Sequence, residues 1–440
     1  MDREVLALWL LLSVAALVQA VLLGLHSMEH MRYAHRRVRN VGRLTRVGRA
    51  AVIVPCKGLD LGLAENLRPL FEQDYHKFRI MVVIGTADDP ACAVIRRLID
   101  HYPQTQAELL IAGRASLCGQ KIHGLLRAID ELDDRIEFLA FLDSDVRPRR
   151  DWLRLLLERL DDPPSTGAVT GYRWFVPTAP RLTNWLLYSI NSTLACLFTA
   201  QGHHLVWGGS WAIRRDVFEA IGMREAWRQQ LSDDLVAARV LHAAGLRVKF
   251  EPACVVASPI DMTLASGFAF LRRQYLLARL YMPRWWLGLF GGTLLATIGF
   301  WLAAGVSIAD CLGVAVGDWW PPAIAAAIVA AQGYRGLIRG EVARTCLPEQ
   351  RSRLRIATWF DLVGAPFAGL FSLAALVASA FGRRVVWRGI EYRFDRCGKV
   401  LSVLHPATEA SPTPMQFDPE SNYAEPSAAR QRRSTVELHG

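Results

Sequence analysis

The chain has 440 residues, of which 52% are hydrophobic and only 21% charged, and its formal net charge is +10. This balance is too apolar for an ordinary soluble enzyme and predicts several membrane-spanning segments. Most of the basic residues are arginines beside apolar runs, which favours anionic lipid headgroups over nucleic acid as their partner. The eight cysteines are scattered without a C-x-x-C pair, so neither a zinc site nor a disulfide framework is expected.

The first apolar run extends from Val5 to about Leu25 and is long enough to cross a bilayer. A cleaved signal peptide is the alternative, but the first four residues lack a positively charged region and the apolar run continues past the possible cleavage site. The next segment, His26–Arg49, contains seven arginines, which the positive-inside rule keeps in the cytosol. We therefore predict a signal-anchor helix over residues 1–28, with the N-terminus outside.

Residues 50–283 are expected to form a cytosolic α/β domain. Short apolar runs typical of buried parallel strands and helical patterns alternate along it; the strands are Ala51–Pro55, Ile80–Ile84 and Phe138–Leu142, and the helices Leu61–Glu72 and Ala91–His101. Such alternation predicts a doubly wound sheet, in which ligands bind at the carboxyl ends of the strands. Residues 180–201 have mixed polarity and predict an interfacial amphipathic helix against the membrane, with a buried core helix as the alternative.

Residues 284–382 are expected to form a C-terminal membrane region. Trp285–Ala309 and Trp319–Ala331 predict a hairpin of two spans, because the following Arg335–Arg355 contains six arginines and should be cytosolic. The last apolar run, from about Ala357 to Phe381, is either a full span or a re-entrant or interfacial segment. Residues 405–440 are poor in apolar side chains and predict a disordered tail.

The strongest chemical motif is the D-x-D of Asp143 and Asp145, directly after the apolar run Phe138–Leu142. Two carboxylates at this spacing can hold a hard divalent cation together with a diphosphate. A D-x-D alone is common in turns, but its place at a strand end puts it where a ligand would bind. The motif therefore predicts a metal-assisted transfer with a nucleoside diphosphate as leaving group.

Two further motifs follow. In Ser232-Asp233-Asp234 the acids open a helical pattern, so one can cap the helix while Asp234 serves as general base toward an acceptor hydroxyl. Gly208 and Gly209, before an apolar strand, allow close approach of the backbone to a ligand or simply form a tight turn.

These motifs are part of an ordered set over roughly residues 50–285 that resembles the ceramide glucosyltransferase branch of the family 2 glycosyltransferases. The set also includes Val54–Gly58, Asn66-Leu67, Gln73–Tyr75, Asp88–Ala91, Lys121–Leu125 and Gly208–Arg215, and Trp387–Arg393 resembles the branch further on. The resemblance implies a GT-A (Rossmann-like) catalytic domain between N-terminal and C-terminal transmembrane helices. It also implies an inverting transfer of a hexose, with glucose favoured, from a UDP-sugar to a lipid hydroxyl, with ceramide as the leading acceptor.

The resemblance also implies roles for single residues. Asp143 and Asp145 would hold Mg²⁺ or Mn²⁺, and Asp234 would be the base. The donor would be bound by Lys57, Asp88, Asp89, Lys121, Asp143, Arg273, Gln274 and Arg279, and the acceptor side formed by Gly208, Gly209, Ser210 and Asp233. For Lys57 and Lys121 a solvated surface lysine is the alternative.

Two positions depart from the family pattern. The acid that usually follows the second strand is replaced by Thr86, for which Asp88 or Asp89 could substitute. The (Q/R)-x-x-R-W motif is altered in Arg272–Leu280, where the Arg is displaced and the Trp is missing. The segment either reaches the diphosphate and acceptor through Arg273, Gln274 and Arg279 or is only a basic interfacial helix.

Other functions remain open at this point: a processive polysaccharide synthase, transfer to diacylglycerol or hopanoid-type lipids, and an inactive membrane scaffold. The three intact acids, Asp143, Asp145 and Asp234, speak against the scaffold. The Arg-rich and Ala-rich composition, without retention signals, favours a bacterial inner membrane over an organelle.

Overall fold

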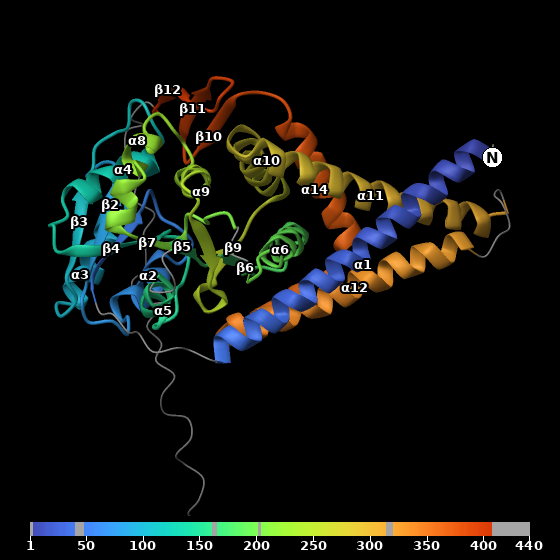
Figure 1. Cartoon of the computed structure of the whole chain (residues 1–440), viewed down its shortest axis with the longest axis horizontal. Coiled ribbons are helices and arrows are strands. Elements are labelled where there is room, and N and C mark those ends of the chain that lie inside the picture. The colour runs from blue at the N-terminus through green and yellow to red at the C-terminus, as the bar shows by residue number, and fades with distance from the viewer. Residues whose placement is uncertain (1–2, 40–47, 161–164, 201–203, 314–319, 407–440) are drawn as a thin grey trace, which may run out of the picture.

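The computed structural model describes residues 3–39, 48–160, 165–200, 204–313 and 320–406 (Figure 1). Nearly all of the predicted tail at 405–440 lies outside the described residues. A seven-stranded sheet of order β3-β2-β1-β4-β7-β5-β8 forms the centre. Its strands are β1 (Arg49–Pro55), β2 (Phe78–Ile84), β3 (Ala107–Ile111), β4 (Ile136–Leu142), β5 (Thr166–Thr170), β7 (Ser210–Arg214) and β8 (Arg247–Phe250).

The first four strands of this sheet run parallel, and β7 is antiparallel to both β4 and β5. Helices cover both faces: α2 (Leu63–Phe71), α3 (Ala91–His101) and α5 (Trp152–Leu160) on one, α4 (Gln120–Asp130), α7 (Arg215–Ala220), α8 (Met223–Trp227) and α9 (Asp233–Ala243) on the other. Residues Ala50–Val54 are fully buried, as an unbroken apolar run in a covered parallel strand should be. The predicted α/β class is confirmed.

A second layer extends from the open end of this domain. The parallel strands β6 (Arg173–Pro177) and β9 (Val256–Ile260) form a separate two-stranded sheet. Helix α6 (Leu182–Ala195) packs on β6 and buries ten of its fourteen residues, so over this part of residues 180–201 the alternative of a buried core helix holds and not the predicted interfacial helix. Helix α10 (Leu264–Tyr281) continues into the membrane region.

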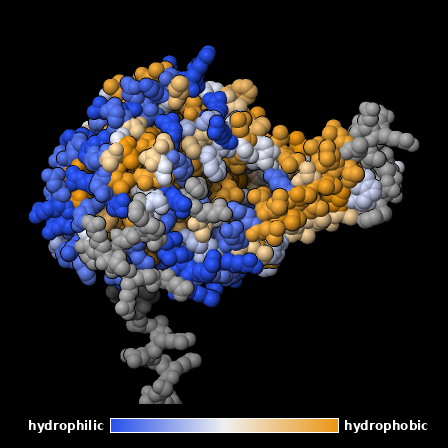
Figure 2. Space-filling view, viewed as in Figure 1, coloured by the Kyte–Doolittle hydropathy of each residue, from blue (hydrophilic) through white to orange (hydrophobic). Residues whose placement is uncertain are grey.

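Three long helices form an arm that projects from the domain: α1 (Arg3–Arg39), α11 (Pro283–Cys311) and α12 (Trp320–Cys346) (Figure 1). Figure 2 shows that the surface of this arm is hydrophobic while the surface of the α/β domain is mostly polar. Helices α1 and α11 approach closely at Gly299, where an added Cβ would lie 2.3 Å from the Cβ of Ala16.

Two helices of the arm, Leu8–Arg39 and Pro283–Ala309, are by themselves long and apolar enough to cross a membrane. The predicted span Trp319–Ala331 is only the first half of α12. The helix continues through a basic second half to Cys346. The last apolar run is split into α13 (Arg351–Val363) and α14 (Ala365–Ser379), which meet at 85°. The bend occurs at Gly364, where a Cβ would collide with the ring of Phe360.

The described chain ends in an antiparallel sheet of β10 (Arg384–Trp387), β11 (Ile390–Phe394) and β12 (Val400–Leu404). This sheet packs back onto the α/β domain: the peptide N–H of Val400 donates to the carbonyl of Gln229 at 2.7 Å, and the Tyr281 hydroxyl donates to the carbonyl of Gly398 at 2.7 Å. The C-terminal sheet is thereby brought beside the carboxyl ends of β1 and β4. Short turns, Pro252–Cys254 and Pro348–Gln350, complete the elements.

Candidate active site

The D-x-D acids lie where β4 ends. The peptide N–H of Asp143 donates to the carbonyl of Gly209 at 3.3 Å, which continues the pairing of β4 with β7. Between the two acids, the Ser144 hydroxyl donates to Asp60 at 2.6 Å. The Arg173 guanidinium, from the start of β6, lies 3.5 Å from Asp143 and 3.4 Å from Asp145. Both carboxylates therefore face the same space.

Lys121, near the start of α4, joins the two acidic motifs. Its ammonium lies 2.8 Å from Asp143 Oδ1 and 3.2 Å from Asp233 Oδ2, and it donates to the Gly208 carbonyl at 3.2 Å. Burial opposes the charge of this lysine, but the carboxylates of Asp143, Asp233 and Asp234 outweigh it and raise the lysine pKa. Conversely, Lys121 and Arg173 hold the pKa of Asp143 below its ordinary value despite burial.

The two acids at the start of α9 have different surroundings. Burial, together with the negative charges of Asp234 and Asp143, raises the pKa of Asp233 to about 7. Asp234 Oδ1 accepts from the Ser232 hydroxyl at 2.5 Å and from the peptide N–H of Leu235 at 2.8 Å, and its Oδ2 accepts from the peptide N–H of Gly208 at 3.1 Å. These bonds fix the Asp234 carboxylate and use both lone pairs of Oδ1, while Oδ2 keeps one lone pair free.

The paired glycines are required by close contacts in this site. A Cβ on Gly208 would lie 2.9 Å from both Asp233 Oδ2 and Lys121 Nζ, and one on Gly209 would lie 2.2 Å from the Trp207 ring and 2.7 Å from Asp143 Oδ2. Ser210 is different, since it is fully buried and its hydroxyl is bonded to Trp152 and Cys254. The structure thus brings the two glycines, but not the Ser210 side chain, to the site.

A charged cavity of about 710 Å³ lies over the carboxyl ends of β1, β2 and β4. Its walls carry five cationic and four acidic side chains: Lys57, Lys121, Arg173, Arg273 and Arg388 against Asp60, Asp143, Asp145 and Asp261. Burial and the neighbouring Arg173 and Arg388 lower the pKa of Arg273 to about 10. The Arg273 guanidinium stacks on Phe270 and Trp387, 5.3 and 5.2 Å from the ring centres, and its Nε has no hydrogen-bond partner among the described residues.

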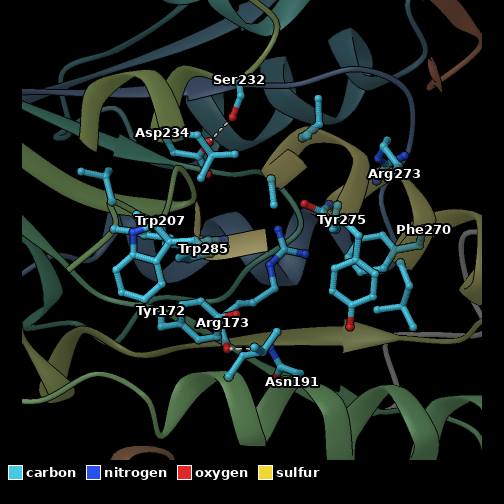
Figure 3. Close-up of a pocket in the computed structure, with 18 of the residues that line it drawn as sticks. Tyr172, Arg173, Asn191, Trp207, Ser232, Asp234, Phe270, Arg273, Tyr275 and Trp285 are labelled. Carbon is cyan, nitrogen blue, oxygen red and sulfur yellow. Dashed lines mark hydrogen bonds between the residues drawn. The ribbon is translucent and has the colours of Figure 1, made fainter. Parts of the chain in front are cut away.

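An apolar cavity of about 330 Å³ adjoins the charged one, between α6, α10 and the start of α11. Its wall is mostly aliphatic and aromatic, and includes Ile190, Leu194, Phe270, Leu277, Trp285, Trp286 and Leu289. Figure 3 shows Arg173 extending into this space between Trp207 and Phe270, with Asp234 and its bond to Ser232 at one end. The Arg173 guanidinium lies 4.9 Å from the centre of the Trp207 ring.

The two cavities share a boundary formed by Lys121, Asp143, Arg173, Phe270, Arg273, Gln274 and Trp387. Asp234 lies on the apolar side of this boundary, and Asp145 lies on the charged side. A phosphate-bearing molecule in the first cavity and an apolar one in the second would therefore meet at Asp143 and Lys121.

Three residues predicted to bind the donor lie elsewhere. Asp89 accepts from the peptide N–H groups of Gly58 and Ala91, and so holds the loop after β1 to the start of α3. Asp88 is exposed, and neither acid lines either cavity. Arg279 donates to the carbonyls of Ala380 and Gly382 behind α14 and lines neither cavity.

Several site residues were missed by the sequence interpretation. Arg173 carries no motif, and it reaches the D-x-D only because β6 leaves the main sheet. Asp60 follows the predicted Val54–Gly58 segment by two residues, so its place after β1 was the available signal. Arg388 belongs to Trp387–Arg393, whose resemblance was noted without a role.

The acids fit a divalent cation. Asp145 Oδ1 is buried and has no hydrogen-bond partner within the described part of the chain, and the contacts to Arg173 are long. No group of three or more His, Cys, Asp or Glu side chains is suited to a metal among the described residues. A magnesium-type ion does not need one, because it is commonly held by one or two carboxylates, waters and substrate phosphates.

The sequence profile of glycosyl transferase family 21 matches residues 10–400. The chain belongs to this family. It is a glycosyltransferase. The predicted likeness to ceramide glucosyltransferases is confirmed, and the matching family model carries the number 21 where the resemblance was stated for family 2.

Among curated relatives, ceramide glucosyltransferase 1 of Caenorhabditis elegans is 21% identical over 53% of this chain and 50% of its own length. The Komagataella phaffii ceramide glucosyltransferase is 36% identical over 13% of this chain and 12% of its own. The chain thus spans half or less of these relatives. Among solved structures, the mannosyltransferase PcManGT from Pyrobaculum calidifontis, in complex with GDP-Man and Mn²⁺, is 18% identical over 84% of this chain and 97% of that chain, with a TM-score of 0.46.

Proposed function

We propose that this family 21 enzyme is membrane-bound and transfers a hexose, glucose in the first instance, from a UDP-sugar to the hydroxyl of a ceramide-like lipid, with inversion at the anomeric carbon. The observation that carries the proposal is the junction of a charged cavity with an apolar one at Lys121 and Asp143. The names of the curated relatives supply the sugar and the lipid class.

In the charged cavity, the donor diphosphate would lie among Lys57, Lys121 and Arg273. Guanidinium and ammonium groups suit phosphate oxygens, and a desolvated site makes their attraction strong. Asp143 and Asp145 would hold Mg²⁺ or Mn²⁺, which when bound supplies further positive charge to the leaving diphosphate. Gln274 lines both cavities and lies beside this position. Asp88, Asp89 and Arg279 are not assigned to the donor.

In the apolar cavity, the lipid chain would lie along α6 and α10 with its hydroxyl at Asp234. The Asp234 carboxylate would accept the hydroxyl proton as the oxygen forms its bond to the anomeric carbon and the bond to the diphosphate oxygen breaks. The peptide N–H of Gly208, which donates to Asp234 Oδ2, would help to orient the base. An attack from the acceptor side, opposite to the diphosphate, inverts the configuration.

The position of the basic helix ends supports a membrane arrangement with the catalytic body in the cytosol. The basic ends of α1 and α12 lie at the catalytic body, and the far ends of both helices lie at the tip of the arm (Figure 1). By the positive-inside rule the body would be cytosolic, with the arm in the bilayer. The apolar cavity reaches Trp285 and Trp286 at the start of α11, where a lipid could enter from the membrane.

The test uses purified full-length protein in detergent with labelled UDP-glucose, Mn²⁺ and separate ceramide, diacylglycerol and sterol-like acceptors. We expect a single labelled lipid on thin-layer chromatography, and its formation should fall by about a hundredfold or more in Asp234→Asn. The exposed Asp134→Asn is the matched control. Unchanged transfer in Asp234→Asn would overturn the base assignment, and label in a polymer instead of a lipid would overturn the acceptor.

A further inference from the structure

The turn between β10 and β11 places an arginine in an unusual backbone conformation. Arg388 and Gly389 form a two-residue hairpin connection, and both have positive φ, 49° and 79°. Such turns favour Asn or Asp followed by Gly, because few other residues tolerate the left-handed region. An arginine in this region is strained, and such strain gathers at functional sites.

The side chain of Arg388 extends into the charged cavity. Its guanidinium donates to Asp60 Oδ1 at 2.6 Å and to the backbone carbonyl of Lys57, both on the loop after β1. The neighbouring Trp387, Ile390 and Tyr392 also line this cavity. The Tyr392 hydroxyl accepts from the peptide N–H of Gln120 at 3.2 Å, which fixes the hairpin to the start of α4. The hairpin is therefore a wall of the cavity.

The excess of cationic side chains in the charged cavity favours an anionic ligand. Of its four acids, Asp261 is paired at 2.8 Å with Arg181, which is not part of the lining. Lys121 likewise contacts Asp233, which is not part of the lining, so the remaining cations Lys57, Arg173, Arg273 and Arg388 face the three acids Asp60, Asp143 and Asp145. The positive charge is in excess, and a divalent cation would add to it. Arg388 bonds the backbone carbonyl of Lys57 and lines the cavity together with Lys57 and Arg273, two basic groups for which no carboxylate contact within 4 Å was found among the described residues.

We propose that Arg388 binds the diphosphate of the nucleotide-sugar donor, and that the C-terminal hairpin thereby completes the donor site. This rests on the proposed function and adds a residue that it leaves unassigned. In the loaded enzyme the guanidinium exchanges its contact with Asp60 for phosphate oxygens, which match its planar fork. The Trp387 ring, stacked on Arg273, holds the second guanidinium beside it.

Titration of full-length protein with UDP and Mn²⁺ by calorimetry tests this. The variant is Arg388→Asn, because Asn accepts the positive φ of the turn and keeps the hairpin folded. We expect UDP affinity to fall about tenfold or more, as for loss of a charged hydrogen bond. Arg393→Asn, on the exposed face of the same hairpin, should bind UDP as the wild type does. Thermal unfolding checks that both variants are folded.

A second variant separates binding from a purely structural role. If Arg388 serves only to hold Asp60, Asp60→Asn will weaken UDP binding as much as Arg388→Asn does, and the inference is overturned. If Arg388 binds the diphosphate, Asp60→Asn releases it and UDP affinity stays within about threefold of wild type or improves. Wild-type affinity in Arg388→Asn would overturn this inference alone, whereas a wild-type protein that binds no UDP would overturn the proposed function.

Discussion

The Lys121 ammonium lies 2.8 Å from Asp143 Oδ1 and so ties the start of α4 to the end of β4. The same ammonium is 3.2 Å from Asp233, and its side chain is 12% exposed. Two acidic motifs that are ninety residues apart in the sequence are thereby held on one cation. Removal of the lysine would leave the buried Asp233 without its counter-charge and Asp143 with the more distant Arg173, 3.5 Å away.

Lys121→Met should therefore destabilise the protein strongly. Removing one partner of a buried ion pair costs about 3–5 kcal/mol, since the remaining charge stays desolvated. Thermal unfolding in detergent would measure this as a lowered midpoint. The control is Lys77→Met at an exposed lysine, which should unfold as the wild type does. Equal midpoints for the two variants would show that Lys121 is not a stabilising counter-ion.

The raised pKa of Asp233 predicts a pH-dependent stability. Its folded value is about 7 against an ordinary 3.8, because of burial and the nearby acids, so the folded state holds a proton that the unfolded state has lost. Between about pH 4 and pH 7 this group therefore lowers stability as pH rises. Unfolding midpoints at several pH values should fall less steeply in Asp233→Asn than in wild type. If the midpoints of both proteins changed equally with pH, the raised pKa of Asp233 would be contradicted.

Gly209→Ala should impair transfer more than it impairs folding. The new Cβ would meet the Trp207 ring at 2.2 Å and Asp143 Oδ2 at 2.7 Å, so Asp143 must shift. A shift of about 1 Å in a reacting group can reduce the rate about a hundredfold. Initial rates of lipid product formation measure the loss. Gly288→Ala, with no atom near its Cβ, is the control and should keep its rate.

The sequence placed the D-x-D at the carboxyl edge of the sheet because it directly follows a strand, whereas Ser232–Asp234 begins α9 and was joined to the site only through the family resemblance. Ligand residues gather at the carboxyl ends of parallel strands, and strand ends can be read from apolar runs. Arg173 could not be found this way, since it comes from a two-stranded sheet whose position depends on packing against α6.

The altered motif on α10 shows a second limit. Arg273 and Arg279 are six residues apart, which turns the second side chain by about 240° around the helix. Arg273 accordingly lines both cavities, while Arg279 faces the end of α14 and donates to Ala380 and Gly382. The packing position of α14 decides which face of α10 lines the cavities and which is covered. The local sequence of α10 does not contain this information.

The apolar cavity offers a test of the acceptor with two leucines on one helix. Leu289 lines the cavity near the start of α11, whereas Leu287 is 60% exposed and lines neither cavity. Leu289→Trp should fill part of the space for the lipid chain and raise the KM for the lipid severalfold, since even one methylene of misfit in an apolar pocket is worth about 1–3 kcal/mol.

UDP affinity should be the same in Leu289→Trp as in wild type, because the charged cavity is not altered. Leu287→Trp adds the same bulk on the outer face of α11 and should change neither the KM for the lipid nor the affinity for UDP. Steady-state rates at varied lipid concentration, with UDP titration on the same preparations, separate the two effects. A lipid KM that is equal in both variants would mean that the acceptor chain does not lie between α6 and α11, and a loss of UDP binding in Leu289→Trp would mean that the two cavities are not independent.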